Sequence, residues 1–266
     1  MKDWLEPTGE LISAIGDESF PRALANALKK IAVFDYTVVF GYLGTTRPLD
    51  LFDTFPKKKR KVFVEDYQEG PYLLDPFFLA ATTSIPPGLH RLKEIAPDRF
   101  YQGEYFRNYY VQTGLAEEIG FLVGLPGDTM VVISLMRASK PFSAKDIREL
   151  RLYWPIVCAA AQQHWSDLST QIEGNATDRQ TDGMERSIER AFQAFGGGIL
   201  TPREREVAEY TLKGYSADAI GKILGIASGT VRIHRKNIYA KLRIGSQGEL
   251  FSKFIVTLSG RTDTNA

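Results

Sequence analysis

The sequence is poor in the features that mark secreted, disulfide-bonded and membrane-spanning proteins. It holds one cysteine in 266 residues, so no internal disulfide can form, and Cys158 stands in the apolar stretch PIVCAAA, where a small buried residue is expected. No apolar run reaches the roughly 18 residues of a membrane span, and MKDWLEPTGE at the start contains no apolar secretory stretch. We therefore expect a cytoplasmic protein with no membrane segment.

Catalytic and metal-binding motifs are also missing from the sequence. His90, His164 and His234 lie far apart and match no metal-ligand spacing, and neither a nucleophile elbow nor a glycine-rich nucleotide loop is present. The three glycines at 196–198 follow no strand and precede no Lys-Ser/Thr pair, which favours a hinge over a phosphate-binding loop. We expect no catalytic residue, metal or cofactor, and keep an enzymatic N-terminal domain as the weaker alternative.

The net charge of +1 conceals an uneven distribution of charge along the chain. Residues 199–258 carry ten Lys and Arg against five Asp and Glu, whereas residues 1–198 carry 22 against 26. A basic C-terminal quarter on a mildly acidic remainder is typical of a nucleic-acid-binding module joined to another domain.

Composition also divides the chain into three parts. Apolar residues thin out after Trp165, where SDLSTQIEGNATDRQTDGME is polar and is followed by a short helical candidate, MERSIERAFQAF. We expect a small-molecule sensor domain at 1–168, a linker and hinge at 169–198, and a DNA-binding domain at 199–266.

The N-terminal part mixes strand and helix patterns. YTVVFGYLG and LDLFDTF read as strands, and IGFLVGLPGDTMVVISLMR reads as two strands around a Pro-Gly-Asp turn. Helical patterns precede them, with a break near Pro21, and follow them in FSAKDIRELRLYWPIVCAAAQQHW. Strands flanked by helices predict an α+β domain, an antiparallel sheet covered by helices, of the GAF or PAS sensor kind.

The basic run PKKKRKV, residues 56–62, resembles a nuclear-import signal. It follows the strand LDLFDTF and precedes VFVEDYQEG, so it falls in a connection whose long side chains reach water. We expect a surface loop there, with at most a nonspecific attraction to phosphate.

The C-terminal part has regular helix start and stop signals. Thr201 and Glu204 form a capping box around Pro202, and Gly214 provides a left-handed stop. A second short helix runs from Ser216 to Leu224 and is ended by Gly225, and its expected buried face is Ala219, Ile220, Ile223 and Leu224. A third helix opens at Ser228 or Thr230, with the core stripe Val231, Ile238 and Leu242, and a second capping box starts a fourth. Two short helices joined by a glycine turn predict a helix-turn-helix within an all-α four-helix domain.

Residues 199–258 resemble the DNA-binding domain of the LuxR/FixJ/NarL family of bacterial transcription regulators. The family pattern stands here as Leu200-Thr201, Arg203-Glu204, Glu206-Val207, Gly214, Ser216, Ile220, Leu224, Ile226, Thr230-Val231-Arg232, His234, Asn237-Ile238 and Lys241-Leu242. The chain departs from it at Ala219, Gly221 and Ala227, and we expect these changes to lower the stability of the domain.

The third helix is expected to enter the major groove of double-stranded operator DNA. Its outer side presents candidates for base contacts, Arg232, Ile233, Lys236 and Arg235, of which the family implies the first three. Phosphate contacts are expected from Thr230, His234, Lys222, Lys241 and Arg243. The resemblance also implies a homodimer formed through the fourth helix, and RNA polymerase is a further expected partner.

The N-terminal domain lacks the acidic set of a phosphorylated receiver but partly resembles the acyl-homoserine-lactone receptors of the same family. Those receptors show Trp-x-x-x-Tyr followed nine residues later by Asp-Pro, and this chain has Phe63-Val-Glu-Asp-Tyr67 followed by Asp75-Pro76, one residue early. The segments from YLLDPFFLAATTS onward are similar to a group of proteobacterial LuxR-type proteins with a GAF-like sensor of unassigned ligand. The effector therefore stays open.

Aromatic residues supply the candidates for a ligand pocket. Phe100, Tyr101, Tyr105, Phe106, Tyr109 and Tyr110 crowd what reads as one helix. The expected ligand-binding residues are Asp75, Tyr67, Tyr72, Phe63, Phe77, Tyr101 and Tyr105, with Asp75 as the central polar group facing a ligand amine or amide. Asp75 could equally serve as a helix N-cap, and the domain could bind a protein partner or dimerise without any ligand.

Overall fold

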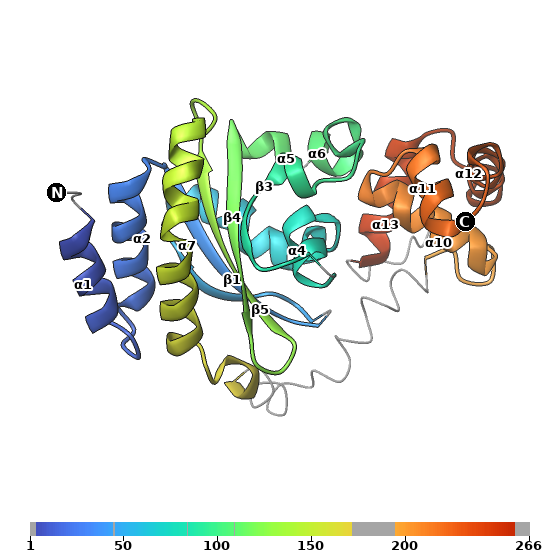
Figure 1. Cartoon of the computed structure of the whole chain (residues 1–266). Helices are drawn as coiled ribbons and strands as arrows, with labels where there is room; N and C mark the ends of the chain where they lie inside the picture. Colours follow the sequence, from blue (N-terminus) through green and yellow to red (C-terminus); the bar gives the residue numbers. More distant parts are fainter. Residues whose placement is uncertain (1–3, 45, 84, 109, 172–194, 259–266) are drawn as a thin grey trace.

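The computed structural model describes residues 4–44, 46–83, 85–108, 110–171 and 195–258. It contains an N-terminal unit built on one antiparallel sheet with helices on both faces, and a C-terminal unit made of helices (Figure 1). The predicted α+β and all-α fold classes are confirmed. Within these ranges, no helix combines the length and the apolar character needed to cross a bilayer.

The sheet has five strands in the order β2-β1-β5-β4-β3. They are β1 (Tyr36–Leu43), β2 (Leu49–Asp53), β3 (Gly88–Arg91), β4 (Glu117–Leu125) and β5 (Thr129–Arg137), and each neighbouring pair is antiparallel. The predicted Pro-Gly-Asp turn joins β4 to β5, with positive φ at Gly127 and Asp128. Sequence patterns missed β3, since four residues are too few to show a period.

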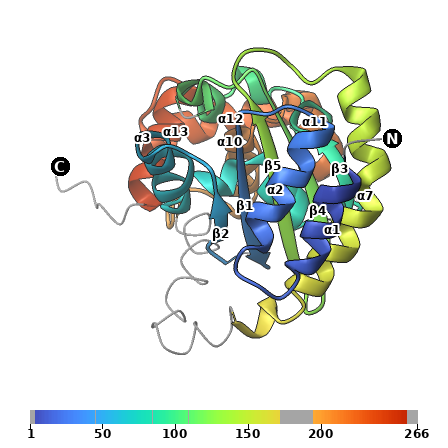
Figure 2. The same cartoon turned by 90° about the vertical axis from the view of Figure 1, so that its left-hand side faces the viewer.

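One face of the sheet is covered by three long helices. These are α1 (Leu5–Ser13), α2 (Phe20–Ile31) and α7 (Ala144–His164), which lie in front of the sheet in Figure 2. Side chains alternate along a strand, so Ile119, Phe121 and Val123 of β4 point to these helices and are fully buried. Pro21 lies in the first turn of α2, where its missing N–H costs nothing, so the predicted break is the start of that helix.

The opposite face is covered by short helical segments. Along the chain these are α3 (Lys57–Arg60), the π-helix η1 (Lys61–Asp66), η2 (Pro71–Leu74), α4 (Pro76–Ala81), α5 (Leu92–Ile95), η3 (Phe100–Gln102), α6 (Glu104–Asn108) and η4 (Tyr110–Thr113). The aromatics expected on one helix are therefore divided among η3, α6 and η4. Gly103 interrupts the helix between η3 and α6 in extended backbone.

The basic run near residue 57 is helical, which corrects the expected surface loop. Lys59 Nζ donates to the Thr113 carbonyl at 2.9 Å and lies over the rings of Tyr36 and Phe63. Arg60 forms ion pairs with Asp50 and Asp53, which both lie on β2. Two of the cations thus hold α3 to the sheet, and only the remaining ones face solvent.

The C-terminal unit contains the four predicted helices, α10 (Pro202–Lys213), α11 (Ala217–Leu224), α12 (Ser228–Leu242) and α13 (Gln247–Leu258). The Thr201–Glu204 capping box and the left-handed stops at Gly214 and Gly225 are confirmed. Helix α12 starts at Ser228 after Ala227, which makes no side-chain cap. The expected burial of Ile223 is wrong, because this side chain is 46% exposed at the outer surface of α11.

Close packing explains why glycine occurs at position 221, although glycine has a low helix propensity. A Cβ at this position would lie 2.6 Å from the Ile226 carbonyl oxygen, so only glycine lets the turn between α11 and α12 approach α11 so closely. The propensity cost expected from the sequence is therefore balanced by a tighter helix-turn-helix.

The two units contact each other through the segment that precedes α6. Asp98 Oδ1 accepts the backbone N–H of Ser216 at 2.9 Å, and the Arg99 N–H donates to the Gly214 carbonyl at 3.0 Å. Helix α6 also packs against α10 and α13 (Figure 1). Residues 168–171 are helical, and the rest of the predicted linker up to residue 194, with the helical candidate in it, lies outside the described residues.

Candidate ligand cavity and DNA-binding surface

Helix α12 presents a polar face to solvent. Thr230, Arg232 and Lys236 are exposed, and the aliphatic side chain of Ile233 beside them is 60% exposed. The opposite side of the helix is buried through Val231, Ile238 and Leu242. The predicted core stripe is confirmed, and three of the four base-contact candidates share the free face.

Arg235 does not belong to this face, which corrects its assignment as a base contact. Its guanidinium is half-buried, its Nε donates to Thr211 Oγ at 3.0 Å and its Nη2 to the Tyr215 carbonyl at 2.9 Å. Burial lowers the pKa of Arg235, partly offset by Tyr239. Arg235 therefore ties α12 to α10 and the turn after it.

The candidates for phosphate contacts also divide into exposed side chains and side chains that are partly buried or bonded within the domain. Lys222, Thr230 and Arg243 are exposed, whereas His234 is partly buried and its Nδ1 has no partner among the described residues. Lys241 Nζ donates to Glu204 Oε2 at 2.7 Å, so the structure assigns this lysine to an ion pair within the domain. Lys241 is thus corrected to a structural role.

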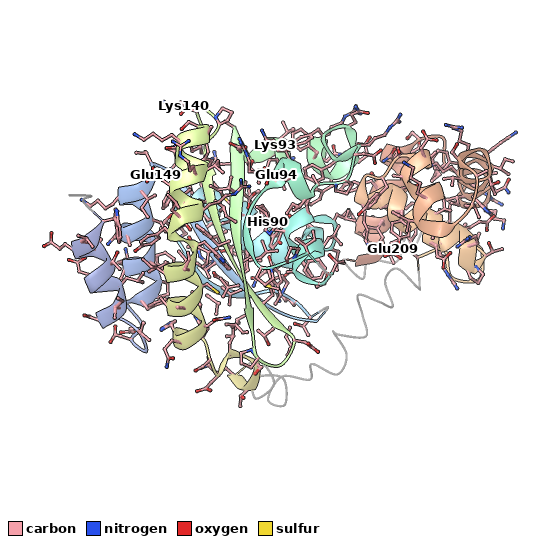
Figure 3. All side chains as sticks on the ribbon, in the orientation of Figure 1. His90, Lys93, Glu94, Lys140, Glu149 and Glu209 are labelled. Atoms are coloured by element: carbon pink, nitrogen blue, oxygen red, sulfur yellow. The ribbon has the colours of Figure 1, made fainter. Side chains whose placement is uncertain are left out.

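The N-terminal unit contains a small cavity between the sheet and its short helical segments. It has a volume of about 30 Å³, and Figure 3 shows side chains filling the surrounding space. Its lining comes from β1, β4 and β5 and from the segments η1 to η4: Val38, Phe40, Tyr42, Phe63, Tyr67, Asp75, Phe77, Tyr105, Tyr110, Thr113, Glu118, Ser134 and Met136.

Five of the seven expected ligand-binding residues line this cavity, namely Phe63, Tyr67, Asp75, Phe77 and Tyr105. The other two do not. Tyr72 is buried but packs against Phe78, outside the lining, and Tyr101 is 48% exposed at the surface. The crowded aromatic residues correctly indicated a buried core. Helical spacing could not distinguish the exposed Tyr101 from its buried neighbours, because the segment is not one helix.

Asp75 is both the N-cap of α4 and part of the cavity lining, the two alternatives that the sequence left open. Its Oδ1 accepts the Phe77 N–H at 3.0 Å as the N-cap of α4, and its Oδ2 accepts the Tyr67 hydroxyl at 2.6 Å. Burial raises the pKa of Asp75 to about 6, although the bonds from Tyr67 and Phe77 oppose this shift. Tyr67 in turn shares a hydrogen bond of 3.1 Å with Tyr42, so these three groups form one buried chain.

Glu118 is the cavity residue that sequence patterns missed. It lies on β4 with 8% of its surface exposed, and its Oε2 accepts the Tyr110 hydroxyl at 3.3 Å. The Ser134 side chain is a second hydrogen-bond partner of this carboxyl group. Burial raises the pKa of Glu118 to about 8, the charge of Asp75 adds to the shift, and Ser134 and Tyr110 partly oppose it. The alternation in EEIGFLVGL was the available signal, since it places Glu118 on the face of Gly120 and Leu122.

Gly120 makes room for the cavity wall. A Cβ at this position would lie 2.5 Å from the Phe77 ring, so glycine on β4 allows α4 to press its first turn onto the sheet. Asp75, two residues before Phe77, lines the same cavity as Glu118 of the sheet.

No group of three metal-ligating side chains occurs in the described ranges. His90, labelled in Figure 3, lies on the edge strand β3 and bonds the Pro86 carbonyl at 2.8 Å. His164 belongs to α7 and His234 to α12.

Residues 198–254 match the family model of bacterial regulatory proteins, luxR family. A putative HTH-type transcriptional regulator in the exeN 3' region of Aeromonas salmonicida is 33% identical over 183 residues, which span 68% of this chain and 93% of that protein. The chain belongs to the LuxR family of HTH-type transcriptional regulators. Its LuxR-type relatives include the transcriptional activator protein PhzR of Pseudomonas fluorescens, 25% identical over 86% of this chain and 84% of that protein.

The N-terminal unit of this LuxR-family chain also has a structural relative. The LBD domain of VqsR from Pseudomonas aeruginosa superposes with a TM-score of 0.54 at 27% identity, covering 60% of this chain and 95% of that one. The chain is a DNA-binding transcription regulator of the LuxR family, with an N-terminal domain of the VqsR LBD fold.

Proposed function

We propose that this regulator binds operator DNA through α12 and that a small molecule in the cavity controls this binding. Arg232, Ile233 and Lys236 contact base edges, and Thr230, Lys222 and Arg243 contact phosphates. The sensor comprises residues 1–168, the linker 169–198 and the DNA-binding domain 199–266. Two copies act as a homodimer on half-sites about one helical turn apart.

One observation carries the control by a ligand. The segment 98–113 reaches both sites, because Tyr105 and Tyr110 line the cavity while Asp98 and Arg99 bond the backbone at the start of α11. A ligand that displaces the two tyrosines moves the surface on which the helix-turn-helix rests. The cavity and α11 are thereby coupled through one short piece of chain.

The relatives support a regulator rather than an enzyme, since they are named as transcriptional regulators. A cytoplasmic location and contact with RNA polymerase follow from action on bacterial promoters. PhzR is named as an activator, which supports activation by this chain as well.

In vitro selection from random DNA tests the proposed function. We expect the full chain to enrich one motif with two half-sites, and Arg232→Ala to lose enrichment of one base in each half-site. Repeating the selection with extract of the host's small molecules is expected to change the yield of bound DNA. Enrichment that is equal with and without extract, across several growth conditions, would contradict ligand control and leave DNA binding intact.

A further inference from the structure

Two buried acids share the cavity without a cationic partner. Asp75 and Glu118 both line it, and Asp75 is the charged group that raises the pKa of Glu118. Among the described residues, no Lys, Arg or His contributes to the electrostatics of either carboxyl group. The cations of this face are used elsewhere, with Lys59 on the Thr113 carbonyl and Arg60 on the acids of the β2 segment.

A buried acid without a counter-charge is unfavourable. A protein that keeps one in its core compensates for it with another interaction, such as a hydrogen bond or a bound ligand. Ionising two such groups in one apolar space costs free energy twice, through lost hydration and through mutual repulsion. Asp75 accepts two donors and Glu118 accepts the hydroxyls of Tyr110 and Ser134, but none of these donors carries a positive charge. A cation from outside the protein supplies the missing counter-charge.

We propose that the cavity binds a small organic cation, a primary ammonium group with a short apolar substituent, between Asp75 and Glu118. The inference rests on the proposed function only in that it names the ligand class of the same cavity. The ammonium donates to the carboxylates of Glu118 and Asp75. Its apolar substituent meets the aromatic wall formed by Phe40, Phe63 and Phe77.

Size and donor chemistry favour this class over others. A space of about 30 Å³ holds roughly two waters or a few heavy atoms, so a long acyl chain enters only after side chains move. A calcium ion takes six to eight oxygen ligands at short distance, and no group of three acidic or histidine side chains exists for it in the described part of the chain. A neutral amide offers donors but leaves the charge of the acids uncompensated.

The charge state of the cavity agrees with a monocation. With the pKa of Asp75 near 6 and that of Glu118 near 8, the pair carries about one negative charge at neutral pH. One bound ammonium neutralises it, and binding lowers the pKa of Glu118.

Thermal unfolding of the full chain with defined probes tests the inference. Ethylammonium and propylammonium chloride at equal concentrations are compared with sodium chloride at matched ionic strength and with 1-propanol as the neutral analogue. At pH 8.5 the alkylammonium salts are expected to raise Tm by about 2 to 4 °C over sodium chloride, whereas 1-propanol leaves it unchanged. The increase is expected to shrink at pH 5.5, where Glu118 is protonated.

Matched variants assign the effect to the cavity. Glu118→Gln and Asp75→Asn keep the shape and a hydrogen-bond acceptor, and each is expected to abolish the increase caused by alkylammonium. Glu10→Gln, which changes an exposed acid on α1 across the sheet, is expected to retain it. Each variant is compared with its own Tm in sodium chloride, so altered basal stability does not affect the result.

The outcomes separate this inference from the proposed function. An increase in Tm that is equal with 1-propanol, with sodium chloride or in Glu118→Gln would overturn the cationic ligand, while ligand control by a neutral molecule would still stand. No increase with any alkylammonium salt at pH 8.5 would overturn it as well. An increase with no effect on DNA binding would support the cation site and contradict its regulatory role.

Discussion

Two glutamates that are almost equally buried behave in opposite ways in the two domains. Glu204 at the start of α10 is 3% exposed and Glu118 in the cavity is 8% exposed. Glu204 receives hydrogen bonds from Lys241 and from the backbone and hydroxyl of Thr201, and these outweigh burial and lower its pKa. Glu118 receives hydrogen bonds from the uncharged side chains of Tyr110 and Ser134, and burial raises its pKa to about 8.

The difference separates a structural acid from a binding acid. In the DNA-binding domain the buried charge is paired inside the fold, so it contributes to stability at neutral pH. In the sensor no cation among the described residues faces the acid, so its ionised form lowers stability. We use the missing counter-charge, rather than burial alone, to mark the proposed ligand site.

The largest expected effect is on the pH dependence of sensor stability. Between about pH 4.5 and 8 folded Glu118 keeps a proton that the unfolded chain has released, so the free energy of unfolding falls as pH rises, by up to about 1.4 kcal/mol per pH unit. Glu118→Gln removes this penalty. We expect the variant to be more stable than wild type by about 2 to 4 kcal/mol at pH 8 and nearly equal at pH 4.5, measured by urea unfolding.

A constant difference between the two proteins across this pH range would break the comparison, because it would mean that Glu118 does not titrate differently on unfolding. Glu10→Gln serves as the control and is expected to follow wild type at every pH.

The next largest effect concerns the two arginines of α12. Arg232 is exposed and Arg235 bonds Thr211 and Tyr215, so we expect Arg232→Ala to weaken specific DNA binding by about 1 to 3 kcal/mol without loss of stability. Arg235→Ala is expected to destabilise the domain by about 1 to 2 kcal/mol and leave base preference unchanged. Fluorescence anisotropy on a selected operator and on single-base variants measures the first, and thermal unfolding the second.

The double variant Lys57→Ser and Lys58→Ser is the control for a loss of positive charge away from α12. Both lysines are exposed on α3, so this double variant is expected to keep specific affinity. Equal weakening of Arg232→Ala on all sequences would reassign that residue to a phosphate contact.

For Glu204 we expect a change in stability of the opposite sign to the one expected for Glu118. Glu204→Gln loses the ion pair with Lys241, and we expect a cost of about 1 to 2 kcal/mol at pH 7. The folded-state pKa of Glu204 is lowered, so its contribution is present above the unfolded pKa of about 4.3 and is lost as pH falls below it. Unfolding of the full chain at pH 7 and pH 3.5 gives the test, and a variant that is more stable at pH 7 would contradict it.

The smallest expected effect lies at the contact between the domains. Asp98→Ala removes the acceptor of the Ser216 N–H, which we expect to weaken local protection by about 0.5 to 1 kcal/mol, or roughly two- to fivefold in the exchange rate of that amide. Asp98→Asn retains an acceptor and is expected to behave as wild type. Unchanged exchange at Ser216 in Asp98→Ala would show that the contact does not form in solution.

Local signals predicted most of the C-terminal domain. The capping box at Thr201 and Glu204 and the glycine stops at 214 and 225 are backbone chemistry within a few residues, so they are readable from the chain alone. Arg235 could not be assigned this way, because its partners lie on α10 and the turn after it, 20 to 24 residues away.

The sensor was harder to predict because its site is assembled across the sheet. The partial receptor motif led to Phe63, Tyr67 and Asp75, which line the cavity. Glu118 comes from a strand 43 residues after Asp75, and no local pattern joins the two. The run at 56–62 looked like a solvated loop, since the acids that pair with Arg60 belong to another segment.

The amino-acid sequence by itself determined the family, the two fold classes and the exposed face of α12, because caps, glycine stops and hydrophobic periods act over short stretches of chain. Only the tertiary structure decided which buried acids have a cationic partner. Whether a carboxylate meets a cation depends on contacts between distant segments, and those contacts separate Glu204, which pairs with Lys241, from Glu118, which is bonded by hydroxyl groups alone.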